Sequence, residues 1–154
     1  TMDEFFDSRL EIYDDQQINN TANAREFLAF TGECLPTVPN SKILDLGCGT
    51  GLELEEYFKI NPSAHVTGID MAPGMLNRLQ EKFSDKNINL ILGSYFDVPL
   101  GHATFNAAVS VESLHHHDTP LTVEHEIECL EAAGFSTVER LRQWGATSTL
   151  KAEK

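Results

Sequence analysis

Apolar and polar residues alternate along the chain with two different periods, and each period predicts one kind of element. Four segments show the three-to-four-residue spacing of an amphipathic helix, namely residues 21–35, 52–60, 73–83 and 121–133. Short, nearly continuous apolar runs are typical of buried strands, and they fall at residues 42–46, 65–69, 88–92 and 105–111. Helices and strands therefore take turns along most of the chain.

This alternation predicts a doubly wound α/β domain. A strand that is followed by a helix and a second strand needs a right-handed crossover, which lays the two strands parallel. After Val111 the rhythm changes, because Thr122 can cap a helix that begins at Leu121 and ends at Gly134. We therefore expect a mostly parallel sheet that is covered by helices.

The end of the chain predicts an antiparallel hairpin. Residues 135–141 and 144–152 have the composition of strands, and a short turn around Gln143 and Gly145 separates them. The expected sheet is thus parallel in its first part and closes with two antiparallel strands.

Length and composition limit the chain to one globular domain. It has 154 residues, of which 41% are apolar and 23% charged, as in ordinary soluble proteins. Asp and Glu outnumber Lys and Arg by 24 to 11, and a formal charge of −13 repels the phosphate backbone of nucleic acids. We therefore do not expect DNA or RNA as partners.

Cysteine usage and hydropathy indicate a reducing compartment without a membrane. Cys34, Cys48 and Cys129 have neither the paired spacing of zinc ligands nor the even count of a disulfide framework. No apolar run approaches the roughly 20 residues of a membrane span, and the first residues are acidic where a signal peptide would be basic. These features predict a cytoplasmic protein.

The strongest candidate for a functional site is the glycine turn that follows the first strand. Gly47, Gly49 and Gly51 stand in the pattern G-x-G-x-G, where backbone N–H groups and a helix N-terminus can approach a ligand; the dinucleotide fingerprint is G-x-G-x-x-G. Asp70 ends the second strand, and a carboxylate there can accept both hydroxyls of a ribose. Two plainer interpretations stay open, a simple strand-to-helix turn and a helix cap at Asp70.

The sequence DLGCGTG at residues 45–51, together with Ile69 and Asp70, closely resembles the class I S-adenosylmethionine-dependent methyltransferases. Three further segments resemble that family in the same order: GSYFDVPL at 93–100, FNAAVSVESLHH at 105–116 and LEAAGFSTVERL at 130–141. The resemblance implies a Rossmann-like fold in a single methyltransferase domain over residues 1–154. Its parts would be an N-terminal helical cap (1–40), a cofactor-binding half (41–112) and a closing helix and hairpin (121–154).

The resemblance also implies a role for each matching residue. Asp45 would hold the ammonium of the cofactor S-adenosyl-L-methionine, directly or through water, and Asp70 would hold its ribose hydroxyls. The whole set implied for the cofactor is Asp45, Gly47, Cys48, Gly49, Asp70, Met71, Ser94, Tyr95 and Val111. Met71 would pack on the adenine, with core packing as the plainer alternative, and Cys48 is a small residue of the turn rather than a reactive thiol. Ser94 departs from the family, where Asp is common, and a hydroxyl accepts a hydrogen bond more weakly than a carboxylate.

Catalysis requires few residues in such a site. Methyl transfer from a sulfonium is an in-line displacement, and alignment of the reactants can supply roughly 7–11 kcal/mol. If the acceptor has to lose a proton, His115 and His116 after the fourth strand are candidates for the base, with packing or solvated side chains as the alternative. The run His115–Asp118 has residue types that bind metals, but consecutive residues of an extended chain point to alternate faces, so we expect no metal site.

The N-terminal aromatic residues bear on the acceptor. Tyr13 and the aromatic residues before it either form a lid over the substrate, as the leading segment does in similar enzymes, or belong to a helix packed on the sheet.

The usual fifth strand and its crossover helix are absent from this sequence. Only Asp118, Thr119 and Pro120 separate His117 from Leu121, whereas a parallel crossover needs about a dozen residues or more. Residues 114–119 therefore look like a junction of two segments that are distant in other members. Either the intervening residues are missing from this sequence, or the protein lacks them; we favour the first, because the loss of a central strand would expose its neighbours' edges.

These observations lead to one main hypothesis and two alternatives. The main hypothesis is an S-adenosylmethionine-dependent methyltransferase that acts on a small molecule, with no membrane partner and with a homodimer left open. The alternatives are a non-catalytic module that binds S-adenosylmethionine or S-adenosylhomocysteine, and an NAD-type oxidoreductase on the same sheet topology.

Overall fold

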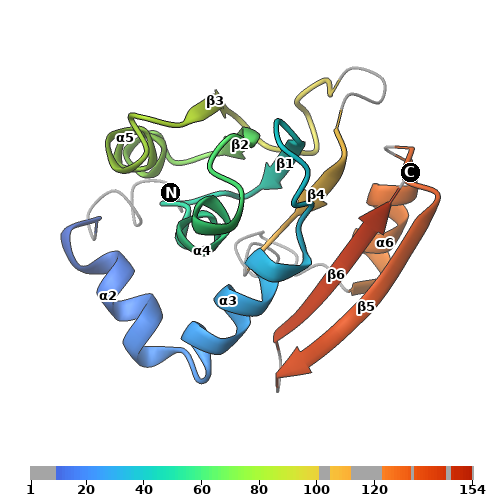
Figure 1. The fold of residues 1–154 in the computed structure, drawn as a ribbon, viewed down its shortest axis with the longest axis horizontal. Helices are drawn as coiled ribbons and strands as arrows, with labels where there is room; N and C mark the ends of the chain where they lie inside the picture. Colours follow the sequence, from blue (N-terminus) through green and yellow to red (C-terminus); the bar gives the residue numbers. More distant parts are fainter. Residues whose placement is uncertain (1–9, 101–104, 112–122, 133, 145–146, 154) are drawn as a thin grey trace.

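A computed structural model describes residues 10–100, 105–111, 123–132, 134–144 and 147–153. Its elements in chain order are α2 (Leu10–Asn20), α3 (Ala24–Cys34), β1 (Lys42–Leu46), α4 (Leu52–Ile60), β2 (His65–Asp70), α5 (Pro73–Lys82), β3 (Asn87–Leu92), β4 (Ala107–Val109), α6 (Val123–Ala132), β5 (Thr137–Trp144) and β6 (Thr147–Glu153). Strands and helices alternate from β1 to β3, and the hairpin with α6 lies to one side of the parallel strands (Figure 1).

The central sheet is parallel, with the strand order β3-β2-β1-β4. Leu46 at the end of β1 is in register with Ile69 of β2, and Asp45 is in register with Val109 of β4. Because the strands are parallel, their carboxyl ends meet at one edge, which is where ligands of open α/β sheets bind. The glycine turn after β1 and Asp70 at the end of β2 therefore lie at the same edge.

One face of the sheet is covered by the helices that the periodicity predicts. Ile43 of β1 belongs to a cluster of fully or almost fully buried side chains that includes Leu54 and Tyr57 of α4 and Leu79 of α5. Pro73 stands at the first position of α5, where its missing N–H has no partner to lose. Ile43 and Asp45 are two residues apart in β1, so their side chains point from the same face of the strand. The apolar stripes of α4 and α5 pack on this face.

The opposite face is covered by the C-terminal part of the chain. Leu130 of α6, Phe135 and Ala152 of β6 form a second buried cluster, against which Leu46 and Ala108 of the sheet are packed. Gly134 has a φ of 92° and, as predicted, ends α6. Its N–H donates to the carbonyl of Glu131, 3.0 Å away.

Two element boundaries differ from the sequence prediction. The fourth strand is limited to Ala107–Val109, and just before it the Lys42 N–H of β1 donates to the side-chain Oδ1 of Asn106 at 2.7 Å. The hairpin turn does not include Gln143, which lies in β5 opposite Ser148 of β6. Among the described residues, the hairpin also forms a two-stranded sheet of its own rather than continuing the parallel one.

Other predictions fall on residues 112–122, which lie outside the described part of the chain. These are the helix cap at Thr122 and the junction at 114–119. The absence of a fifth parallel strand and the division of the chain into a cap, a cofactor-binding half and a closing part stay predictions.

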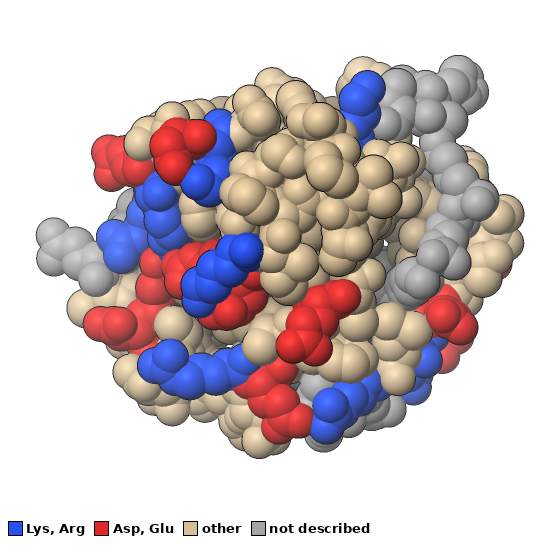
Figure 2. Space-filling view, in the orientation of Figure 1, with Lys and Arg blue, Asp and Glu red and all other residues tan. Residues whose placement is uncertain are grey.

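Positive side chains on the surface lie beside negative ones. Figure 2 shows Lys and Arg next to Asp and Glu mainly along the left and lower parts of the face it draws. Lys82 bridges Asp14 and Glu55, at 2.9 and 2.8 Å, and Arg142 pairs with Glu26 at 2.7 Å. Pairing of this kind lowers the local positive potential that a nucleic-acid backbone needs. Within the described residues, every helix is too short or too polar to cross a bilayer.

Candidate cofactor-binding site

The turn between β1 and α4 is built on left-handed glycines. Gly47, Gly49 and Gly51 have φ angles of 70°, 49° and 71°, which side chains other than glycine adopt only with strain. The N–H groups of Gly47 and Cys48 donate to the carbonyl of Ile69, at 2.9 and 3.1 Å. These bonds tie the turn to the end of β2, so its shape is set by the sheet and not only by its own residues.

Asp70 joins three loops at the carboxyl edge of the sheet. Its Oδ2 accepts from the Gly49 N–H at 2.8 Å, and its Oδ1 accepts from the Ala72 N–H at 2.9 Å. Its backbone carbonyl accepts from the Gly93 N–H at 2.9 Å. The residue before α5 that serves as its N-cap is Ala72, with no side-chain capping bond. The carboxylate of Asp70 is therefore held between the glycine turn and the residue that precedes α5.

Two buried carboxyl groups lie next to this turn. Asp45 of β1 is 0% exposed and Glu53 of α4 is 5% exposed. The two groups interact with each other, and they can share a hydrogen bond only if one carries a proton. Neither oxygen of Asp45 has any other hydrogen-bond partner among the described residues. Burial, followed by the negative charge of Glu53, raises the pKa of Asp45 well above its ordinary value.

Cys48 fills space and is not reactive. Its side chain is buried, and a Cβ added to Gly68 of β2 would come within 2.8 Å of its sulfur. Burial, together with the negative charges of Asp45 and Asp70, raises the pKa of the Cys48 thiol well above its ordinary value. The thiol therefore stays protonated, so only the backbone of Cys48 has a polar role in the turn.

The residues predicted for the adenine lie around Asp70. Met71 is 45% exposed, which rules out core packing for its side chain. Ser94 uses its hydroxyl locally, because Oγ accepts from the Phe96 N–H at 3.3 Å. The Tyr95 ring packs against Phe96 with centroids 4.5 Å apart. The bond from Gly93 to Asp70 brings this loop to the end of β2, next to Met71.

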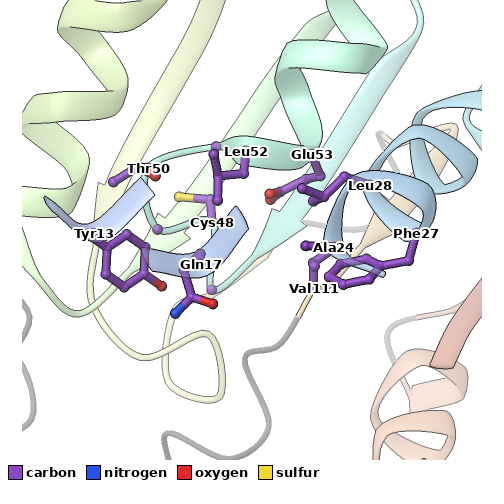
Figure 3. A pocket seen from close by; sticks show the side chains of 13 residues that line it. Tyr13, Gln17, Ala24, Phe27, Leu28, Cys48, Thr50, Leu52, Glu53 and Val111 are labelled. Atoms are coloured by element: carbon purple, nitrogen blue, oxygen red, sulfur yellow. The ribbon is translucent and has the colours of Figure 1, made fainter. Parts of the chain in front are cut away.

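A small pocket lies between the glycine turn and the N-terminal helices. It has a volume of about 50 Å³, and its lining side chains come from α2, α3 and the turn (Figure 3). Val111 lines it as well. Pockets that enclose a drug-sized ligand measure roughly 300–1,000 Å³. The pocket is therefore far smaller than one that encloses a nucleoside.

Comparison with known proteins agrees with this geometry. Residues 43–133 match the family described as a methyltransferase domain. The chain belongs to this family.

Individual relatives show how much of the domain is shared. The chain is 31% identical over 91 residues to an O-methyltransferase of Aspergillus nomiae, a match that covers 56% of this chain and 40% of the relative. It is 32% identical over 90 residues to a malonyl-[acyl-carrier protein] O-methyltransferase of Bacillus cereus, with 53% and 34% covered. The chain thus spans less than half the length of these two relatives.

Solved structures share the fold. A SAM-dependent methyltransferase of Aquifex aeolicus superposes with a TM-score of 0.60 at 18% identity, over 95% of this chain and 97% of that one. The four-stranded parallel sheet with its flanking helices is thus the Rossmann-like α/β fold of S-adenosylmethionine-dependent enzymes.

In this methyltransferase domain, α2 is fastened over the glycine turn through Asp14. The Thr50 hydroxyl donates to Asp14 Oδ1, Lys82 Nζ donates to Oδ2 at 2.9 Å, and Arg78 Nε lies 3.5 Å from the same oxygen. Burial acts to raise the pKa of Asp14, but the hydrogen bonds from Thr50 and Lys82 outweigh it, so the pKa is lowered. A carboxyl group with a lowered pKa adds stability at neutral pH, and this stability is lost as the pH falls through that pKa.

Replacing Asp14 by Asn should loosen α2 without unfolding the domain. A partly exposed ion pair contributes up to about 1 kcal/mol, so we expect amide hydrogen exchange in α2 to become roughly five times faster at neutral pH. Asp15→Asn, an exposed neighbour on the same helix, is the matched control and should leave exchange unchanged. Equal rates for wild type and D14N would show that Asp14 does not fasten α2.

Sequence reasoning missed several residues of the site. Thr50 is buried and bonded to Asp14, and Gln17 of α2 lines the pocket beside Tyr13, which the sequence placed either in a substrate lid or in a helix packed on the sheet (Figure 3). Glu53 was also missed, although a signal was present: it stands four residues before the buried Tyr57, on the apolar side of α4. An acidic residue at a core position of a helix indicates a site. The catalytic candidates His115 and His116, and the rest of the run to Asp118, lie outside the described residues.

Proposed function

We propose that this methyltransferase domain transfers the methyl group of S-adenosyl-L-methionine to a small-molecule acceptor by in-line displacement. The observation that carries the proposal is the pairing of a left-handed glycine turn with the Asp70 carboxylate, which is held beside it by two backbone N–H groups. Each oxygen of the Asp70 carboxylate has two lone pairs, so it can accept a second hydrogen bond besides the one from the backbone. Asp70 can thus accept the two ribose hydroxyls.

The residues present fit the cofactor at its other end as well. Asp45 is a buried carboxyl with no hydrogen-bond partner other than Glu53 among the described residues, and an ammonium group supplies donors and a positive charge. A Cβ at Gly49 would meet nothing within 4 Å, so a ligand can lie directly on the backbone there. Met71, Ser94 and Tyr95 are proposed for the adenine, and Val111 and the backbone of Gly47 and Cys48 for the amino-acid part.

The chain's own contribution to the reaction is alignment. When bound, the cofactor supplies a methyl group that is carried on a sulfonium sulfur. The rest of the cofactor leaves as a neutral thioether. Asp70 and Asp45 would hold the two ends of the molecule, and α2 over the turn would exclude water. For an acceptor that must lose a proton, we propose His115 or His116 as the base.

The acceptor class is proposed from charge and from relatives. A net charge of −13 and the pairing of surface Lys and Arg with carboxylates disfavour nucleic acids. Both relatives are named as O-methyltransferases, and the name of one of them gives malonyl-[acyl-carrier protein] as what it acts on. A small molecule with an oxygen nucleophile is therefore the first class to test. The cytoplasmic location and a homodimer stay predictions.

Calorimetric titration separates the proposed function from its alternatives. S-adenosylmethionine and S-adenosylhomocysteine should bind at micromolar concentration, and NAD should not. No binding of either sulfur compound at millimolar concentration would overturn the proposal, and NAD binding would favour an oxidoreductase. A methyl-transfer screen with the same protein then distinguishes an enzyme from a module that binds without turnover.

A further inference from the structure

Asp45 and Glu53 form a buried pair of carboxyl groups, whereas the ammonium of the cofactor requires only one. Asp45 lies on β1 and Glu53 in the first turn of α4, and both are almost fully buried. Ionising both would place two like charges in contact in a medium of low dielectric constant, which is strongly unfavourable. One shared proton removes that cost.

The groups around the pair do not neutralise it. Asp70 at the end of β2 adds negative charge, and the thiol of Cys48 is protonated. Lys82 of α5 attracts Glu53 electrostatically, but its Nζ donates to Asp14 and Glu55.

The other described residues that line the pocket are neutral. α2 contributes Tyr13 and Gln17, and α3 contributes Ala24, Phe27 and Leu28. A single positive group is therefore what this pair lacks, and Glu53 itself lines the pocket where a ligand would arrive (Figure 3).

The geometry points to a proton exchange at this pair. We assign Glu53 as a second carboxyl for the cofactor's ammonium and infer that Asp45 and Glu53 hold one shared proton until the ammonium replaces it. On binding, the O–H bond of the carboxyl breaks, the proton passes to solvent, and both carboxylates accept hydrogen bonds from the ammonium. This inference rests on the proposed function, because it takes the ligand to be S-adenosylmethionine.

Such an exchange makes binding depend on pH in one direction. Because the free pair holds a proton that the bound pair releases, affinity should rise with pH by up to about tenfold per unit, until the free pair is itself deprotonated. A site that held an ammonium on an already ionised carboxylate would show no such rise.

Titration of S-adenosylhomocysteine into the wild-type protein, in phosphate and in Tris buffer at several pH values near neutrality, counts the protons released. We expect about one proton per bound ligand. 5′-Methylthioadenosine, which has the nucleoside and the sulfur but no ammonium, should bind more weakly and release none. If S-adenosylhomocysteine binds without proton release, the inference is wrong and the proposed function stands; if it does not bind at all, both fail.

Glu53→Gln tests the assignment from the protein side. An amide cannot take the proton, so release should fall toward zero, and the loss of one negative partner should weaken S-adenosylhomocysteine about tenfold while leaving 5′-methylthioadenosine unaffected. Glu56→Gln, on the same helix but paired with Lys59 at the surface, is the matched control and should behave as wild type. Unchanged proton release in a folded E53Q protein would overturn the assignment, and the wild-type proton count is independent of whether the variant folds.

Discussion

Replacing Asp70 by Ala should strongly weaken cofactor binding. The variant loses the acceptor for two ribose hydroxyls, and hydrogen bonds to a charged group contribute about 1.5–3 kcal/mol each, so we expect Kd for S-adenosylhomocysteine to rise by roughly a hundredfold or more. Gly49 and Ala72 also lose the carboxylate that accepts their N–H groups. The loop therefore loosens at the same time as the ligand contact disappears.

Calorimetry on the folded variant measures this effect. The two freed N–H groups cost about 1–3 kcal/mol of stability, so circular dichroism has to establish that the D70A protein is folded at the temperature of the titration. Asp85→Ala, which removes an exposed carboxylate paired with Lys86, is the control and should bind as wild type does. A folded D70A protein with wild-type affinity would show that the ribose does not bind at this edge of the sheet.

Gly49→Ala and Gly51→Ala should separate binding from folding within one turn. At Gly49 a Cβ meets nothing within 4 Å, so the variant bears mainly the strain of a positive φ, about 1 kcal/mol. The new methyl group, however, occupies the open space over the backbone where we propose that the cofactor lies. We expect a loss of affinity of at least about tenfold with little loss of stability.

At Gly51 the same methyl group points into the core. It would lie 3.1 Å from Leu79 Cδ1 and 3.1 Å from Phe83 Cε2, in addition to the strain of a φ of +71°. Overpacking of this kind costs about 1–3 kcal/mol, so G51A should unfold at clearly lower urea concentration. Its folded fraction should still bind the ligand. The opposite pattern, with G49A unstable and G51A defective only in binding, would contradict the placement of the cofactor over Gly49.

Much of the parallel half of the fold could be predicted because its signals are local. The apolar stripe of α5, with Met75, Leu76 and Leu79, is written at helical spacing, and the structure buries all three. The left-handed turn required glycine at three positions, and glycine stands there. The hairpin boundaries were less accurate, since Gln143 suits either a strand or a turn and only its pairing with Ser148 decides between them.

The site itself was predicted unevenly. Asp70 follows from its position at the end of a strand and Asp45 from the family resemblance of the glycine motif. Glu53 was overlooked because the helix dipole favours an acidic residue in the first turn of any helix. Ser94 was expected to face an adenine, yet its hydroxyl accepts a bond from the Phe96 N–H. A local backbone donor competes with a ligand for such a hydroxyl.

Short-range patterns in the chain are thus enough for the order of helices and strands, the parallel sheet, the glycine turn and the carboxylate at the end of β2, because each follows from neighbours a few residues apart. The tertiary structure alone decided that Glu53 meets Asp45 in the interior, that Asp14 fastens α2 over the turn, and that the hairpin forms a separate sheet. These features join residues that are far apart along the chain, as Asp14 and Lys82 are, and no local periodicity encodes such a contact. They arise only when packing brings the elements together and burial changes the chemistry of the groups it encloses.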